Sequence, residues 1–230
     1  MKKILSIDVG IKNLGLCIWD IDTSSIKYWR VINLCDDLFI CSYCNNKSSS
    51  FYKEDQNIVY VCNKCKKKLS INYDIIPIVK TSTKDFSIIK LGINLKKLLN
   101  NKDILGVDKV IIENQIGPLA NKMKTIQGML MQFFIMNNIT DIEFISASKK
   151  LKYFFPSKSE HIKTYKQRKK IAITLCENII KRDHNEYVDY FRNNIKKDDL
   201  ADCFLQLLGY MFSKKHIDEN KYKEFIALVT

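Results

Sequence analysis

Short apolar runs at the start of the chain predict the first three strands of a sheet. The runs cover Lys3–Asp8, Leu14–Asp20 and Ile26–Leu34, and polar turns at Gly10–Asn13 and Asp22–Ser25 separate them. Runs of this length, rich in β-branched residues and bounded by turn residues, are typical of strands. Because connections this short reverse the chain direction, the pattern predicts a three-stranded antiparallel meander.

Helical and strand-like patterns alternate in the second half of the chain. Ser82 and Thr83 can cap a helix, and Pro118 can start another. The apolar positions that recur at helical spacing are Ile88, Ile89, Leu91, Leu95, Leu98 and Leu99 in the first helix, and Met123, Ile126, Met129, Leu130, Phe133 and Phe134 in the second. Buried strands are expected at Lys109–Glu113 and Ile142–Ser146.

The chain ends with a long basic loop and two helices. The loop covers Ala147–Lys163 and has no clear periodicity, and the helices are expected at about Tyr165–Arg182 and Asp199–Phe212. The resulting order of elements is β-β-β-α-β-α-β-α-α. Three antiparallel strands followed by alternating helices and parallel strands predict an α/β fold, a mixed five-stranded sheet with helices on its faces.

Composition and charge narrow the class of protein. A chain of 230 residues with 46% hydrophobic residues supports one domain, residues 1–230, rather than two full domains. A net charge of +13 and a pI near 9.3 favour a polyanionic partner, with nucleic acid as the first candidate. No apolar run is long enough to span a bilayer, and Met1–Gly10 lacks the apolar segment of a secretory signal, so no membrane partner and an intracellular location are expected.

The segment from Cys35 to Lys80 differs in composition and is interpreted as an insertion within that domain. It carries two Cys-x-x-Cys units, Cys41 with Cys44 and Cys62 with Cys65, and residues 45–61 lie between them. This spacing is typical of a structural zinc site with four cysteines, as in a zinc ribbon. A segment this polar would depend on the bound metal for its stability. The alternative is a loop with free thiols.

Four carboxylates come from distant parts of the sequence and are the candidate catalytic residues. Asp8 and Glu113 each end an apolar strand, while Asp199 and Asp202 are three residues apart and share one face of the last helix. If the helix crosses the sheet near these strand ends, the four acids converge and need cations between them. Mg²⁺ prefers such oxygen ligands, and two ions could hydrolyse a phosphodiester. Solvated acids that only serve a helix dipole are the alternative.

The order and spacing of three motifs resemble RuvC-type Holliday junction resolvases of the ribonuclease H superfamily, and most closely those of poxviruses and other large DNA viruses. The motifs are IDVGIKNLG at Ile7–Gly15, IIENQ at Ile111–Gln115 and KKDDLADCF at Lys196–Phe204. Lys12 and Asn13, the pair Glu113 and Gln115, and the basic TYKQRKK at Thr164–Lys170 resemble the viral branch.

This resemblance covers the chain outside the cysteine insertion and carries several expectations. It implies a ribonuclease H-like fold and a homodimer that makes paired, symmetric nicks in a four-way DNA junction with Mg²⁺ or Mn²⁺. By position, the metal ligands would be Asp8, Glu113, Asp199 and Asp202, and Asp198 competes with Asp199 for one of these places. In a virus, the place of action would be the site of viral DNA replication in the host cell.

Basic and polar residues near these motifs are the candidate DNA contacts. Phosphate or base contacts are expected from Lys12, Asn13, Gln115, Lys166, Arg168, Lys169, Lys170 and Lys196. Tyr153, Phe154, Phe155 and Tyr165 could stack on unpaired bases, although the first three are better explained as core residues. His161 and His184 are assigned no chemistry.

Three other functions compete with a junction resolvase. A transposon-type nuclease combines a RuvC core with a zinc ribbon, but its ribbon typically falls after the glutamate, whereas the cysteines here precede Glu113. A sugar-kinase or actin-like ATPase needs a further glycine-rich phosphate loop, and this chain has seven glycines in all. The third is a catalytically inactive DNA-binding module.

Overall fold

Five strands form the central sheet, and their directions follow the predicted order. The computed structural model describes residues 2–35, 39–55, 57–69, 73–79, 82, 86–116, 121–146, 153–154 and 164–227. The strands are β1 (Lys3–Asp8), β2 (Leu14–Asp20), β3 (Ser25–Ile32), β7 (Lys109–Asn114) and β8 (Ile142–Ser146). The strand order is β3-β2-β1-β7-β8. β1, β2 and β3 pair antiparallel, while β7 pairs parallel with both β1 and β8. The predicted mixed five-stranded sheet is confirmed.

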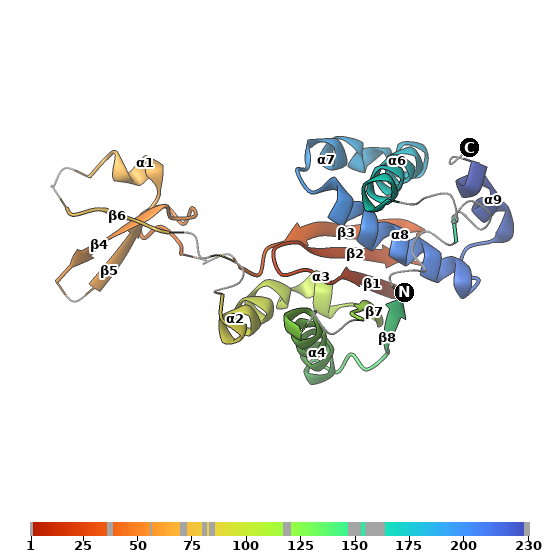
Figure 1. Cartoon of the computed structure of the whole chain (residues 1–230), viewed down its shortest axis with the longest axis horizontal. Helices are drawn as coiled ribbons and strands as arrows, with labels where there is room; N and C mark the ends of the chain where they lie inside the picture. The colour runs from red at the N-terminus through yellow and green to blue at the C-terminus, as the bar shows by residue number, and fades with distance from the viewer. Residues whose placement is uncertain are drawn as a thin grey trace.

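Helices cover both faces of the sheet (Figure 1). One face is covered by α2 (Ile88–Leu99), α3 (Lys102–Leu105) and α4 (Asn121–Met136). The other face carries α6 (Tyr165–Asp183), the short turn η1 (Asn185–Tyr187), α7 (Val188–Asn193) and α8 (Lys197–Ser213), and α9 (Glu219–Ala227) follows. Two apolar cores result, one on each side of the sheet.

Strand alternation decides which side chains meet which helices. Leu5 and Ile7 of β1 belong to the core under α2 and α4, whereas Ile4 belongs to the core under α8. Ser6, on the same side as Ile4, accepts a hydrogen bond from Gln206 of α8. Because side chains alternate along a strand, the next even position, Asp8, also faces α8.

The first helix begins later than predicted. Ser87, not Ser82 or Thr83, caps α2, because its backbone is extended and its hydroxyl accepts a hydrogen bond from the Lys90 backbone N–H. Thr83 and Pro118 lie outside the described residues, as does the loop Ala147–Lys163 apart from residues 153–154. Phe154 is buried as a core residue.

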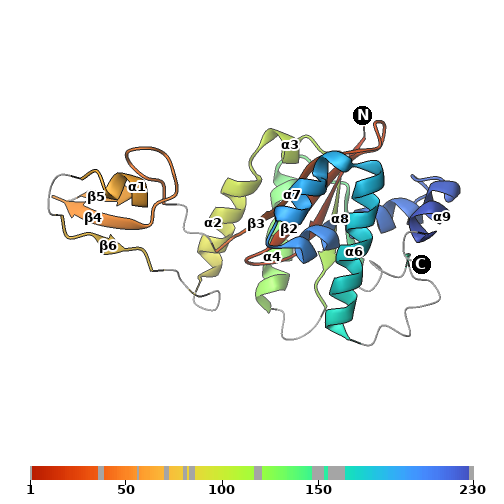
Figure 2. The same cartoon turned by 90° about the horizontal axis from the view of Figure 1, so that it is seen from above.

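The cysteine-containing segment forms a separate small sheet. It consists of β4 (Ser50–Glu54), β5 (Asn57–Val61) and β6 (Ile76–Pro77) in the order β5-β4-β6, with α1 (Asn63–Lys66) beside them. Figure 2 shows this sheet at one end of the molecule, beyond the central sheet. Tyr52 is fully buried between its partners, since its ring stacks on Tyr73 at 4.0 Å and its hydroxyl hydrogen-bonds Tyr43.

Within the parts of the chain that the structure describes, no helix has the length and apolar character needed to cross a membrane.

Candidate active site

Asp8 and Glu113 come from neighbouring parallel strands. Ile7 of β1 pairs with Ile112 of β7. The next residue of each strand is an acid: Asp8 is the last residue of β1, and Glu113 follows the buried part of β7. The two acids therefore lie at the same edge of the sheet. Both side chains follow the alternation that faces α8. Asp8 is only 8% exposed, and Glu113 is half-buried.

The first turns of α8 bring the other two carboxylates to this edge. Asp199 and Asp202 lie on its side toward β1, and the turn is fixed to the sheet because the indole Nε1 of Trp29 donates a 3.0 Å hydrogen bond to the Leu200 carbonyl. Gly15, which pairs with Asp8 on β2, makes the close approach possible. A Cβ added to Gly15 would lie 2.8 Å from the Asp199 carbonyl oxygen and 3.3 Å from the Asp8 Cβ.

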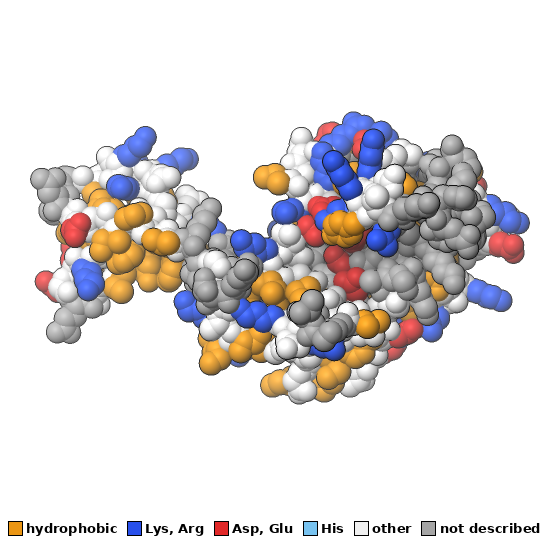
Figure 3. All heavy atoms as spheres, viewed as in Figure 1, with side chains coloured by type: hydrophobic (Ala, Val, Ile, Leu, Met, Phe, Trp, Pro, Cys, Tyr) orange, Lys and Arg blue, Asp and Glu red, His pale blue; other side chains and the backbone are white. Residues whose placement is uncertain are grey.

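All four predicted carboxylates line one surface pocket of about 380 Å³. Its lining is Asp8, Val9, Glu113, Gln115, Tyr165, Arg168, Lys169, Ala172, Asp199 and Asp202. Figure 3 shows acidic side chains gathered near the middle of the main body, with Lys and Arg side chains beside them. The pocket therefore combines the ends of β1 and β7 with the first turns of α6 and α8.

Asp199 is the carboxylate whose titration is most altered by this environment. Burial, together with repulsion from Asp198 and Asp8, raises the pKa of Asp199 to about 6, although Lys169 and Lys196 oppose the shift. Its Oδ2 atom is buried and has no hydrogen-bond partner among the residues that the structure describes. A buried carboxylate oxygen without a donor is costly, and a cation would relieve this cost.

Two cationic side chains and one aromatic ring of α6 complete the pocket. Arg168 and Lys169 line it next to Tyr165, and the Lys169 ammonium lies 4.9 Å from the centre of the Tyr165 ring. The same ammonium donates a 2.5 Å hydrogen bond to Asp198 Oδ2. The sequence indicates Tyr165 only as one of four rings that could stack on unpaired bases. Its spacing from Arg168 and Lys169 places all three residues on one face of the helix.

Gln115 is held against Glu113 by a partner that the sequence did not reveal. Its side-chain Nε2 donates a 3.0 Å hydrogen bond to Glu113 Oε2, and its backbone N–H donates a 2.8 Å hydrogen bond to Gln127 Oε1. Gln127 lies on α4 and so connects the loop after β7 to the helix on the opposite face. Nothing in the local sequence around Gln127 distinguishes it from an ordinary polar helix residue.

The remaining predicted DNA contacts are not part of the pocket lining. They are Lys12, Asn13, Lys166, Lys170 and Lys196. Lys12 and Asn13 lie in the turn between β1 and β2, Lys166 and Lys170 are exposed on α6, and Lys196 is exposed immediately before α8. Each is thus near an element that contributes to the pocket.

The chemistry of the pocket fits a hard divalent cation. Its acids offer carboxylate oxygens, the ligands that Mg²⁺ and Mn²⁺ prefer, and one of these oxygens is orphaned. The acids are not packed as closely as the cysteines are. Among the described residues, the four cysteines are the only set of three or more Cys, His, Asp or Glu whose ligand atoms all lie within 4.8 Å of one another.

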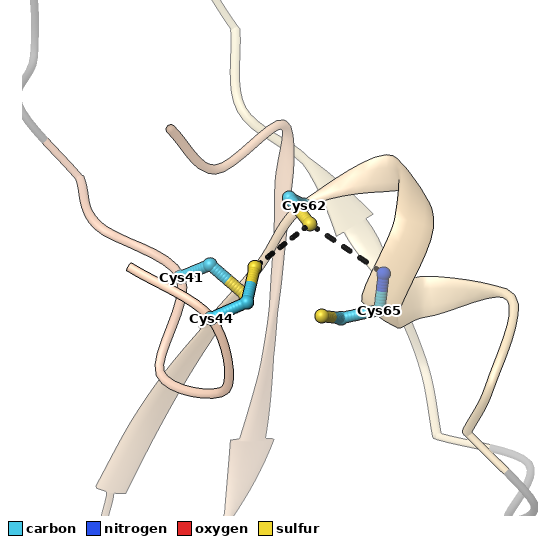
Figure 4. Close-up of side chains that lie close together, drawn as sticks. All are labelled: Cys41, Cys44, Cys62 and Cys65. Atoms are coloured by element: carbon cyan, nitrogen blue, oxygen red, sulfur yellow. Dashed lines mark hydrogen bonds between the residues drawn. The ribbon is translucent and has the colours of Figure 1, made fainter. Parts of the chain in front are cut away.

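The cysteine cluster has the geometry of a four-ligand metal site (Figure 4). Cys41 and Cys44 come from the loop before β4, and Cys62 and Cys65 come from the start of α1. Backbone N–H groups point at two of the sulfurs. The Cys65 N–H donates a hydrogen bond to Cys62 Sγ and lowers the pKa of Cys62. Burial alone would raise the pKa of Cys41, but hydrogen bonds from the backbone of Tyr43 and Cys62 lower it to about 6. Cys35 is not a member of the cluster.

The strand order and the helices on both faces give a ribonuclease H-like α/β fold, and an acidic pocket lies at the carboxyl ends of β1 and β7. A comparison with known protein families finds no match. An uncharacterised protein, L451 of Acanthamoeba polyphaga mimivirus, is 27% identical over 234 residues, which is 90% of this chain and 56% of that protein. The chain therefore spans little more than half of this relative.

Among solved structures, the chain is similar to a viral Holliday junction resolvase and to a bacterial RuvC protein. The fowlpox virus resolvase is 19% identical, with a TM-score of 0.45 over 92% of this chain and 99% of the other. RuvC of Thermus thermophilus is 12% identical, with a TM-score of 0.46 over 92% and 96% of the two chains. The same bacterial protein in complex with a Holliday junction gives a TM-score of 0.41 at 11% identity, over 93% and 96% of the chains.

Proposed function

We propose that this protein is a metal-dependent endonuclease that resolves four-way DNA junctions. The observation that carries the proposal is the meeting of Asp8, Glu113, Asp199 and Asp202 in one pocket that also contains Arg168. Acids from three distant segments, with cationic groups beside them, suit a site that binds divalent ions and a phosphodiester together. The resemblance of the three sequence motifs to RuvC-type resolvases supports the choice of a branched DNA substrate.

The residues of the pocket would divide the work of hydrolysis. The four carboxylates would hold two divalent ions, Mg²⁺ or Mn²⁺, which supply an activated water and charge neutralisation when bound. Arg168 and Lys169 would hold the scissile phosphate, and their cationic groups would stabilise the charge that develops on its oxygens. Gln115 would orient Glu113 through the hydrogen bond between them.

A homodimer is part of this proposal, because two symmetric nicks in one junction need two active sites. The side of the sheet opposite the pocket offers apolar side chains for a second copy of the chain. Ile89 and Ile93 lie one turn apart on α2 and are 71% and 50% exposed, and Met136 at the end of α4 is 74% exposed. Exposed apolar residues that lie next to each other, as Ile89 and Ile93 do, are common at protein interfaces.

We also propose one structural zinc ion in the cysteine cluster. Four sulfurs within 4.8 Å of one another, with backbone donors aimed at Cys41 and Cys62, match the needs of a tetrahedral thiolate site. The cluster lies between β3 and α2 and so precedes Glu113 in the chain. This order favours a junction resolvase with an inserted module over a transposon-type nuclease.

Cleavage of defined DNA substrates tests the proposal. The protein is incubated with a labelled four-way junction, with linear duplex and with ATP, each with and without Mg²⁺. We expect paired nicks in the junction only when Mg²⁺ is present. Turnover of ATP would instead support a kinase-like function, cleavage of linear duplex alone would support a transposon-type nuclease, and binding without cleavage would support an inactive DNA-binding module.

The variant Asp8→Asn provides the internal control. It removes one ligand and one repulsive charge, so cutting is expected to fall by at least about 1000-fold while junction binding is retained or becomes tighter. Loss of binding in Asp8→Asn, with an altered thermal unfolding curve, would show that Asp8 is structural.

A further inference from the structure

Asp198 precedes Asp199 in the chain but does not line the pocket. Asp199 and Asp202 line the pocket, whereas Asp198 is absent from its lining. The Asp198 Oδ2 atom accepts the hydrogen bond from Lys169 Nζ at 2.5 Å, and both side chains are largely buried in this contact, with 24% and 34% exposure. The pair therefore joins the first turn of α8 to the first turns of α6.

Lys169 is held from two sides and still lines the pocket. Asp198 contacts its ammonium, and the Tyr165 ring lies 4.9 Å from the same ammonium. A free lysine side chain samples many rotamers, and fixing it in advance removes part of the entropic cost of using it. The hydrogen bond to Asp198 also raises the pKa of Lys169 well above its usual value. An ammonium has three donors, so the contacts with Asp198 and Tyr165 leave one for another acceptor.

We propose that Asp198 is a positioning residue that holds the Lys169 ammonium at the pocket for contact with a DNA phosphate, and that it is not a metal ligand. This inference rests on the proposed nuclease function. It assigns different tasks to two adjacent acids: Asp199 faces the candidate metal site, and Asp198 faces α6. A change at Asp198 should therefore act on phosphate contact through Lys169, apart from its repulsion of Asp199.

A double-mutant cycle with Asp198→Asn and Lys169→Gln tests this dependence. Lys169→Gln is expected to slow single-turnover cleavage of the junction by about 10- to 100-fold, and Asp198→Asn by up to about 10-fold. The double variant should be no slower than Lys169→Gln alone. Asp198→Glu should recover most of the rate, because it retains the carboxylate. Thermal unfolding of all variants identifies any that have lost the fold.

Two further measurements separate a positioning residue from a ligand and from a simple structural contact. The Mn²⁺ concentration that gives half-maximal cleavage should change only slightly in Asp198→Asn, through the loss of its repulsion with Asp199, whereas a large rise would make Asp198 a ligand and overturn the proposal. Lysine acylation, followed by mass spectrometry without DNA or metal, should show Lys169 more reactive in Asp198→Asn than in the native chain. The neighbouring Lys170, which is exposed, provides the reference.

Other outcomes would also reject the positioning role. Additive losses in the double variant would mean that Asp198 acts independently of Lys169, and unchanged acylation would mean that the ion pair does not hold Lys169 in solution. If the native chain cuts no DNA at all, the proposed function fails. Acylation, together with the affinity for the junction measured in the same variants without metal, would then still decide whether Asp198 positions Lys169 for phosphate contact.

Discussion

At Gly15, a missing side chain determines how close α8 comes to the ends of β1 and β2. The Asp199 carbonyl oxygen occupies the space that a Cβ would need, at 2.8 Å, and this oxygen belongs to backbone that cannot rotate away. The neighbouring Asp8 Cβ and Cys203 Cβ would lie 3.3 Å from the added atom. The close packing of these backbones is thus what brings acids from a strand and a helix into one pocket.

Gly15→Ala should displace the start of α8 and impair cleavage. A shift of a few tenths of an ångström at Asp199 would alter the metal geometry, and misplacement of about 1 Å can cost about 100-fold in rate. We expect a loss of about 10- to 100-fold in single-turnover cleavage. Gly128→Ala is the matched control, because nothing lies within 4 Å of a Cβ added there. It should stabilise α4 by up to about 1 kcal/mol and leave cleavage unchanged.

Asp199 should make the metal-free protein less stable as the pH rises. Its pKa is raised from 3.8 to about 6, so the folded chain binds this proton more tightly than the unfolded chain. The group's favourable contribution is therefore fully present below about pH 4 and is lost as the pH rises through about 6. Asp199→Asn removes the negative charge of this side chain and with it the repulsion from Asp198 and Asp8.

Thermal unfolding in EDTA measures this effect at two pH values. At pH 8 the midpoint for Asp199→Asn should exceed that of the native chain by about 2–4 °C if the repulsion costs about 1 kcal/mol. At pH 4.5 the two midpoints should nearly coincide. An equal difference at both pH values would mean that Asp199 is not under electrostatic strain.

At the scale of the elements, the sequence predicted what depends on local pattern. The apolar runs of β1, β2 and β8 and the periodicity of α6 were read with bounds within a few residues, because alternation and helical spacing depend on which face is buried. The cap of α2 was placed four or five residues too early, since Ser82, Thr83 and Ser87 all carry the hydroxyl that a cap needs and the local sequence does not decide between them.

What the sequence missed depends on contacts between distant elements. His184 was assigned no role from the sequence, but it is 4% exposed and its ring lies 5.0 Å from that of Trp19 in an edge-on contact. The hydrogen bond between Lys169 and Asp198 joins α6 to α8 in the same way. Nothing in the sequence next to these residues indicates either contact, so only the packing of the helices on the sheet reveals the two pairs.

The small sheet of β4, β5 and β6 should depend on bound metal, whereas the central sheet should not. The segment buries few apolar residues, so without metal at its four thiols little would hold the small sheet together. Cys44→Ser should therefore abolish zinc binding, measured by elemental analysis against about one zinc per native chain, and should unfold the small sheet.

Spectroscopy can follow the two sheets separately. Both tryptophans, Trp19 and Trp29, lie on strands of the central sheet, while Tyr43, Tyr52 and Tyr73 pack together in the small one. Tryptophan fluorescence should be unchanged in Cys44→Ser, and the near-ultraviolet circular dichroism of tyrosine should decrease. Loss of the tryptophan signal as well would mean that the two sheets fold as one unit. Cys203→Ala, outside the cluster, is the control for loss of a cysteine.

At the scale of the whole molecule, a chain with a net charge of +13 places cationic side chains beside an acidic pocket. Four acids without cations would repel a phosphate backbone. The first turns of α6 carry Lys166, Arg168, Lys169 and Lys170, of which Arg168 and Lys169 line the pocket, and Lys196 precedes α8. Binding of DNA should therefore depend on these cations, and the salt dependence of binding measures how many of them contact phosphates.

Junction affinity should fall steeply with salt, and individual lysines should account for the slope. If about five of these side chains each neutralise one phosphate, the plot of log K against log salt concentration has a slope of about −4.5, and Lys166→Gln or Lys170→Gln should each reduce its magnitude by about 1. Lys102→Gln is the control, because Lys102 starts α3 near the amino end of β7, whereas the pocket lies at its carboxyl end. An unchanged slope in Lys166→Gln and Lys170→Gln, or an equal change in Lys102→Gln, would place the DNA on another surface.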